Sequence, residues 1–193
     1  MGIYLNPDSS KFEEAVNSDI YVDKTGLLTY TNSVLHTMQK YICISRPRRF
    51  GKSTAANMLT AYYSRGCDAE QIFSQFEIAK DSGFKKYLNK YNTISVNMQE
   101  ILSRSRSIYE LIERFNKLLI RDLKKEYPDV DYFDDTDVIE CMQDVYSQKK
   151  QAFVVILDEW DCIFREYKED KAAQEKYLDF LRDVLKDKAY IHL

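Results

Sequence analysis

The sequence predicts an α/β fold with a mostly parallel sheet flanked by helices. Short apolar runs lie at residues 40–45, 93–97 and 151–157, and helical patterns separate them. Strands that alternate with helices along a chain favour a parallel sheet with helices packed on its faces. The last of these runs is apolar at nearly every position, which is typical of a strand buried on both sides. We therefore expect a three-layer sandwich.

Composition places the chain among ordinary globular proteins. Its 193 residues are 45% hydrophobic and 31% charged, which suits one domain with a full core. The net charge of −3 provides no overall positive field for nucleic acid. The four cysteines show no C-x-x-C spacing, so reduced thiols are expected instead of a zinc site. Without a signal segment or an apolar run of membrane-spanning length, we expect a cytoplasmic protein that does not contact a membrane.

Residues 1–39 are expected to form a lead-in segment that packs on the domain. A brief helix is predicted over 11–16. Asp23 or Thr25 is placed to cap a second helix that ends between residues 35 and 39. The Asp-Lys-Thr sequence at this point is explained most simply by capping and a surface ion pair.

The remaining elements follow from hydrophobic periodicity and from the positions of turn residues. In chain order, we expect a helix at 52–64, a short helix at 70–76, a weakly helical segment at 78–88, a strand at 93–97, a polar loop at 99–106, a helix at 108–126, an acidic capping loop at 129–137, a helix at 136–148, a strand at 151–157, a helix at 168–186 and a strand at 189–193.

The most informative motif is the turn between the run at 40–45 and the helix that begins at Lys52. It ends in Gly51-Lys52-Ser53, the last part of the phosphate-binding pattern G-x-x-x-x-G-K-[ST]. The N–H groups of such a turn, and of the helix after it, bind phosphate oxygens. The lysine of the pattern reaches the β- and γ-phosphates, and the hydroxyl binds Mg²⁺. We therefore expect Lys52 to bind phosphate and Ser53 to hold Mg²⁺.

One position departs from this pattern, because Arg46 stands where the first glycine is expected. Only Gly51 remains to adopt a backbone conformation that other residues avoid. A basic turn that merely ends in Gly-Lys-Ser is the plain alternative. The candidate cofactor-binding residues form one continuous run, namely Arg46, Pro47, Arg48, Arg49, Phe50, Gly51, Lys52, Ser53 and Thr54.

A second motif follows the apolar run at 151–157, which ends in Asp158-Glu159. Because the carboxyl ends of parallel strands meet at one edge of a sheet, Asp158 is expected beside the turn. There Asp158 would hold Mg²⁺, and Glu159 would polarise a water molecule as a general base. Taken alone, this pair is also explained by a strand end that caps the next turn. The two motifs together predict a site for ATP and Mg²⁺ in which Glu159 and Lys52 are catalytic.

Two further residues follow the acidic pair. Trp160 is expected to pack beneath the site instead of stacking on a base. Asp161 is expected either to support Glu159 or to cap the next turn.

These motifs resemble those of the bacterial AAA-ATPase-like family. The resemblance rests on residues 21–25, 46–53 and 156–161, and it spans nearly the whole chain from about Phe12 onward. It implies that Arg-Pro-Arg-Arg-Phe-Gly-Lys is the family's own form of the phosphate-binding turn. It also implies that the acidic pair after the apolar run is the family's Walker B motif.

The resemblance further implies that a strand lies between the strand at 40–45 and the strand at 151–157, and residues 189–193 would supply it. Members of the family are typically joined to a C-terminal nuclease-like domain of the PD-(D/E)XK type. Residues 1–193 would then form an incomplete AAA-ATPase-like P-loop NTPase domain, truncated at the C-terminus.

Two function classes stay open. The first is a Mg²⁺-dependent ATPase module, with weak turnover on its own, that acts on a nuclease-like domain or nucleic acid in a longer form. The second is a nucleotide-bound or empty interaction scaffold without useful hydrolysis. A small-molecule or polynucleotide kinase is a third and weaker reading, because Asp-Glu at a strand end favours activation of water. ATP is favoured over GTP, since no guanine-reading Asn/Asp-Lys-x-Asp sequence is evident, and the oligomeric state stays open.

Overall fold

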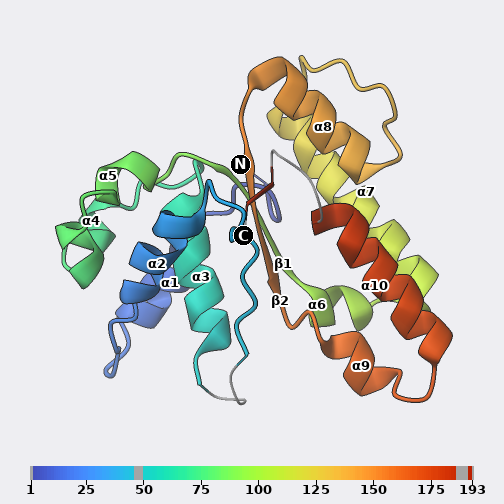
Figure 1. The fold of residues 1–193 in the computed structure, drawn as a ribbon, viewed down its shortest axis with the longest axis horizontal. Coiled ribbons are helices and arrows are strands. Elements are labelled where there is room, and N and C mark those ends of the chain that lie inside the picture. The colour runs from blue at the N-terminus through green and yellow to red at the C-terminus, as the bar shows by residue number, and fades with distance from the viewer. Residues whose placement is uncertain (1, 46–49, 186–190, 193) are drawn as a thin grey trace.

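The computed structural model describes residues 2–45, 50–185 and 191–192 (Figure 1). Helices α1 to α5 lie on one side of a small sheet, and helices α6 to α10 lie on the other. In chain order, the elements are α1 (Ser10–Val16), α2 (Gly26–Val34), α3 (Lys52–Tyr63), α4 (Glu70–Phe73), the 3-10 helix η1 (Glu77–Lys80), α5 (Phe84–Tyr87), β1 (Asn92–Asn97), α6 (Met98–Leu102), α7 (Ile108–Glu126), α8 (Val138–Lys149), β2 (Phe153–Asp158), α9 (Cys162–Glu166), α10 (Lys171–Leu185) and β3 (Ile191–His192).

The three strands of the described chain lie in the order β1-β2-β3 and run parallel. β1 and β2 pair along their whole length, and the last pair joins Asn97 to Asp158. β3 is much shorter and pairs only with Phe153 and Val154 at the beginning of β2. The expected α/β class with a parallel sheet is therefore confirmed, and β2 lies at the centre of the sheet.

Side chains of β2 alternate between the two faces of the sheet, and the hydrophobic core forms one cluster on each face. Val154 and Ile156 pack in the cluster that includes buried residues of α1, α2 and α3. Phe153 and Val155 pack in the other cluster, with buried residues of α7, α8 and α10. Since successive side chains of a strand point to opposite faces, helices cover both faces of the sheet. β2 is accordingly apolar at nearly every position, as its sequence predicts.

The N-terminal segment closes the outer edge of β1. Leu5 forms an antiparallel bridge with Ile94. The backbone of Asn6 donates to the carbonyl of Thr93 over 2.7 Å, and the Asn6 side chain accepts from the Thr93 N–H over 2.8 Å. α1 then packs on α3. Leu5, Asn6 and α1 are thus in contact with the rest of the chain, and the description of residues 1–39 as a lead-in segment stays a prediction.

The expected strand at 40–45 is wrong. Residues 40–45 belong to no strand, although they run along the same side of β2 as β3 does. A strand requires a neighbour with which its backbone can form hydrogen bonds. Within the described residues β3 ends at His192, and a cavity separates residues 41–45 from β2. No ladder of hydrogen bonds therefore forms there.

The expected polar loop at 99–106 is wrong in its first half, which is helix α6. The side chain of Asn97 accepts from the N–H of Glu100 and caps this helix. Met98, Ile101 and Leu102 are buried. α6 is a single turn that follows β1 directly, so its apolar residues are too few to produce a clear period of 3.6 residues.

Most other elements agree with the expectation, with changes at their ends. β1, α3, α7 and α8 are confirmed within one or two residues. α4 is shorter than expected, and α9 was not expected at all. The last expected strand is confirmed at Ile191–His192, while residues 186, 189, 190 and 193 lie outside the described part of the chain. Among the described residues, no helix combines the length and hydrophobicity needed to cross a bilayer.

Candidate functional site

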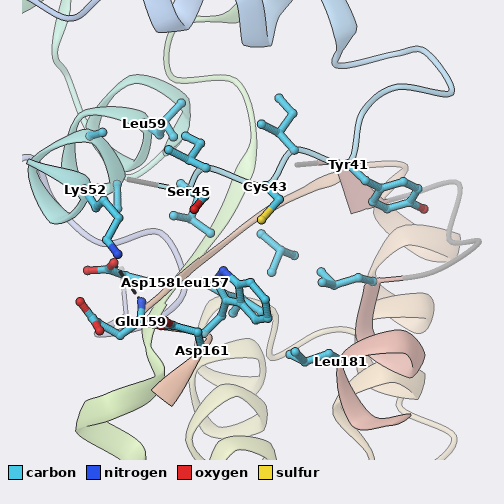
Figure 2. A pocket seen from close by; sticks show the side chains of 18 of the residues that line it. Tyr41, Cys43, Ser45, Lys52, Leu59, Leu157, Asp158, Glu159, Asp161 and Leu181 are labelled. Carbon is cyan, nitrogen blue, oxygen red and sulfur yellow. Dashed lines mark hydrogen bonds between the residues drawn. The ribbon is translucent and has the colours of Figure 1, made fainter. Parts of the chain in front are cut away.

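The carboxyl end of β2 and the beginning of α3 border one cavity of about 440 Å³ (Figure 2). Lys52, Asp158 and Glu159 lie together at one end of it. Figure 2 shows the Lys52 side chain pointing toward Asp158. The tertiary structure therefore brings the central residues of the two sequence motifs to one place.

The remaining residues of the predicted cofactor-binding run are distributed differently. Phe50 and Thr54 line a second cavity, of about 420 Å³, and Gly51 lies between them on its wall. Ser53 is exposed at the beginning of α3. Arg46, Pro47, Arg48 and Arg49 lie outside the described residues.

The beginning of α3 is suited to an anion. Gly51 precedes the helix with a φ of 75° and a ψ of 31°, the left-handed conformation that favours glycine. No side chain of a described residue caps the helix. The first N–H groups of a helix have no partner within it, and the helix dipole makes this end positive. As far as the described side chains are concerned, the N–H groups at the beginning of α3 are thus available to an anionic ligand.

The acidic side of the site is built on the turn that follows β2. Asp158 accepts a hydrogen bond from the N–H of Glu159 over 2.9 Å. Glu159 itself has a φ of 52°, a left-handed conformation in which a glutamate is strained by about 1 kcal/mol or more. This conformation lets the chain turn sharply from β2 toward α9, so that both carboxylates stay at the end of the strand.

Arg165 on α9 binds the acidic side and was not predicted from the sequence. One nitrogen of its guanidinium donates to Glu159 Oε2 over 2.6 Å and to Gln99 Oε1 over 3.2 Å. The other nitrogen donates to Asp161 Oδ1 over 2.5 Å. Burial acts to lower the pKa of Arg165, but the two carboxylates outweigh it and raise that pKa. Arg165 therefore holds the candidate general base in a charge-assisted hydrogen bond.

One feature of the sequence could have pointed to Arg165. Asp161 and Arg165 are four residues apart, the spacing at which opposite charges meet on a helix. Finding this pair requires knowing that α9 exists, and α9 is only five residues long.

The two residues after Glu159 only partly follow expectation. Trp160 is 37% exposed and lines the cavity, so it is not simply packed beneath the site. Its ring meets Phe164 edge-on, with the ring centroids 6.1 Å apart. Asp161 precedes α9 without a capping hydrogen bond from its side chain. It supports Glu159 through their shared partner, Arg165.

The far end of the cavity is apolar and lies between residues 41–45 and β2. Tyr41 and Cys43 line it from one side, and Leu181 of α10 lines it from below in Figure 2. Along this edge of β2, β3 pairs with Phe153 and Val154 only. The backbone of β2 beyond Val154 therefore faces the cavity instead of a further strand within the described chain.

The available donors suit a small hard cation better than a transition metal. Among the described residues there is no group of three or more His, Cys, Asp or Glu side chains that could enclose a metal ion. Asp158 lines the cavity with Lys52, whereas Ser53, the residue after Lys52, is exposed and is not among the residues that line it. Mg²⁺ takes one or two oxygen ligands from a protein and fills its other positions with water and phosphate. Asp158 thus offers one oxygen ligand of the kind that Mg²⁺ accepts.

Comparison with known proteins identifies the family of the chain. Neither a curated protein nor a solved structure matches the chain. A family model described as "Predicted AAA-ATPase" matches residues 9–190, which include both motifs and nearly all of the described elements. The chain therefore belongs to the AAA-ATPase-like family of predicted AAA-ATPases.

Proposed function

We propose that this protein binds ATP together with Mg²⁺ in the cavity between α3 and β2, and that it is an ATPase module. Membership of the family supports a nucleotide-binding or ATPase role. The observation on which the proposal rests is the meeting of Lys52 with Asp158 and Glu159 in one cavity, although more than 100 residues of sequence separate them. We assign the fold to the P-loop NTPase class on the same grounds.

Each polar group would have a defined role toward the nucleotide. The N–H groups at the beginning of α3 would bind phosphate oxygens, and Lys52 would neutralise the β- and γ-phosphates. Ser53 and Asp158 would hold Mg²⁺. When bound, this cation neutralises charge that develops on the phosphate oxygens. Phosphoryl transfer needs little more than this positioning and charge neutralisation.

Glu159 would act as the general base for the attacking water. Glu159 lines the cavity next to Asp158, which is the position that this role requires. It is also paired with Arg165, so it must share or release that contact in order to accept a proton. This pairing fits a protein that binds ATP more readily than it hydrolyses it.

The sheet agrees with only part of the strand order that the family resemblance implies, because residues 40–45 form no strand. That order places a strand between residues 40–45 and β2. β3 occupies the beginning of this position, and the apolar part of the cavity occupies the rest. Coupling to a nuclease-like domain, to nucleic acid or to further copies of the chain stays a prediction.

Calorimetric titration of MgATP into the parent protein and into Lys52→Ala tests the proposal. We expect the parent to bind, and the variant to bind at least about tenfold more weakly because the phosphates lose a cationic partner. Lys125→Ala is the matched control, since Lys125 is exposed on α7, in the helical layer on the other side of the sheet. If the parent did not bind MgATP, or if Lys52→Ala bound equally well, the proposed site would be wrong.

A nucleotide-bound scaffold is the second candidate function, and the Glu159–Arg165 ion pair favours it. Glu159→Gln separates the two functions, because loss of a general base lowers turnover by about a hundredfold or more while binding persists. Glu166→Gln is the control, because Glu166 is a nearby glutamate at the end of α9 with an exposed side chain. A parent protein that binds MgATP but turns it over no faster than Glu159→Gln would be a scaffold.

A further inference from the structure

The phosphate-binding turn is contacted from a second side by Lys24, a residue outside both motifs. The Lys24 Nζ donates to the carbonyl oxygen of Phe50 over 3.2 Å. Lys24, Phe50 and Gly51 line the second cavity, whereas Lys52 lines the first. The two lysines therefore approach the same turn from different cavities.

The contact is close because Gly51 has no side chain. A Cβ atom built on Gly51 would lie 2.7 Å from the Lys24 Nζ. The ammonium thus occupies the space that a side chain at position 51 would take. Glycine at this position serves two purposes, since it allows both the left-handed φ of 75° and the approach of Lys24.

The residues on either side of Lys24 hold its backbone against η1. Asp23 accepts hydrogen bonds from the N–H groups of Thr25, over 2.8 Å, and of Glu77, over 2.9 Å. The hydroxyl of Thr25, which is fully buried, accepts from the N–H of Ile78 over 3.2 Å. These bonds replace the simple helix cap and surface ion pair that the sequence suggested. Lys24 is consequently presented to the turn from an anchored segment.

Peptide geometry connects this contact to phosphate binding. The described part of the chain contains no cis peptide bond, so the peptide between Phe50 and Gly51 is trans and planar. In such a peptide the carbonyl and the following N–H point in opposite directions. A Phe50 carbonyl held toward Lys24 therefore directs the Gly51 N–H away from Lys24, to the other side of the turn.

We propose that Lys24 is a positioning residue that orients the Phe50–Gly51 peptide before α3 through the Phe50 carbonyl. The inference rests on the proposed function, because it assumes that the turn binds the phosphates of ATP. Lys24 acts on the backbone of the turn, while Lys52 acts on the ligand. Asp23-Lys24-Thr25 would then be part of the nucleotide site although it lies more than 20 residues before Gly51.

Calorimetric titration of MgATP into the parent, Lys24→Met and Lys24→Arg tests this inference, with thermal melting of each nucleotide-free protein. Met keeps the length of the side chain and removes the donor, so we expect roughly tenfold weaker binding, the size of effect typical of a hydrogen bond from a charged group. Arg keeps a charged donor and should restore most of the affinity. Lys11→Met is the matched control, because Lys11 is an exposed lysine of α1 in the same helical layer.

The outcomes separate this inference from the proposed function. A parent that binds MgATP and a Lys24→Met variant that binds it equally well would overturn the role of Lys24 and leave the site intact. If Lys24→Met bound MgATP more weakly and also melted at a lower temperature without nucleotide, Lys24 would support the fold. That result would also overturn its role as a positioning residue. A parent that does not bind MgATP would reject the proposed function itself.

Discussion

The two sides of the candidate site are held in different ways. On the acidic side, Glu159 and Asp161 share the guanidinium of Arg165, so the chain supplies the counter-charge itself. On the turn side, no side chain of a described residue caps α3, and Lys24 holds a backbone carbonyl instead of a carboxylate. Charges satisfied within the chain keep their geometry without a ligand, whereas N–H groups at a helix end remain available to an anion. The comparison suggests that the carboxylate of the candidate general base is held in place before a ligand binds. The N–H groups of the turn obtain their partners only when an anionic ligand binds.

Changing Gly51 to Ala tests the turn side alone. We expect this variant to have the largest effect on stability and MgATP affinity. A left-handed alanine costs roughly 1–2 kcal/mol, and its Cβ would also displace the Lys24 ammonium. We expect the free energy of unfolding to fall by about that amount and MgATP affinity to fall about tenfold. Urea unfolding and calorimetry measure the two quantities.

Gly26→Ala is the matched control for this variant. A Cβ on Gly26 would meet no atom within 4 Å, and its φ is not in the left-handed range. Its position in the first turn of α2 suits alanine, so stability should stay equal or rise by about 0.5 kcal/mol. If Gly51→Ala and Gly26→Ala behaved alike, the turn would not depend on a left-handed residue.

Changing Arg165 to Met tests the acidic side. The variant removes the counter-charge of Glu159 and Asp161 and releases the Glu159 carboxylate toward the cavity. We expect ATP turnover per bound nucleotide to rise several-fold while MgATP affinity changes little. A steady-state phosphate-release assay at saturating MgATP measures this change.

Arg182→Met provides the comparison for that variant, since Arg182 forms an exposed ion pair with Asp179 on α10. Such surface pairs contribute little, so turnover should match that of the parent. Lower turnover in Arg165→Met than in the parent would show that Arg165 positions Glu159 for the reaction instead of restraining it.

The smallest expected effect concerns Asp23, whose hydrogen bonds hold the backbone next to Lys24. Burial acts to raise the pKa of Asp23, but the N–H groups of Glu77 and Thr25 outweigh it, so the pKa lies below its ordinary value of 3.8. A carboxylate with a lowered pKa in the folded state stabilises the fold at neutral pH, and this contribution disappears as the pH falls through that pKa. Because Asp23 is exposed, Asp23→Asn should cost less than about 1 kcal/mol near neutral pH.

Urea unfolding of the parent and Asp23→Asn at neutral pH and at about pH 3 measures this effect. The difference between the two proteins should shrink at the lower pH, whereas Asp19→Asn, at an exposed position nearby, should not differ from the parent at either pH. A difference of the same size at both pH values would mean that the charge of Asp23 does not matter.

The central elements of the fold could be predicted because their information is local. β2 is apolar along its length and ends in Asp158, and α7 repeats its apolar residues at helical spacing from Ile108 onward. The residues 40–45 look like a strand by the same criterion and are not one. A strand depends on its neighbour as well as on its own residues, and composition does not report which segments lie side by side.

The sequence by itself determined the α/β class, the helix that begins at Lys52 and the acidic pair that ends β2. Those features follow from hydrophobic period, from glycine at Gly51 and from the polar residues that end an apolar run. Only the tertiary structure decided that Arg165 pairs with Glu159 and that Lys24 reaches the Phe50 carbonyl. The Lys24 contact joins segments 26 residues apart, and the Arg165 contact depends on the short helix α9. The Lys24 contact depends on how separate segments pack against one another, which no spacing along the chain specifies.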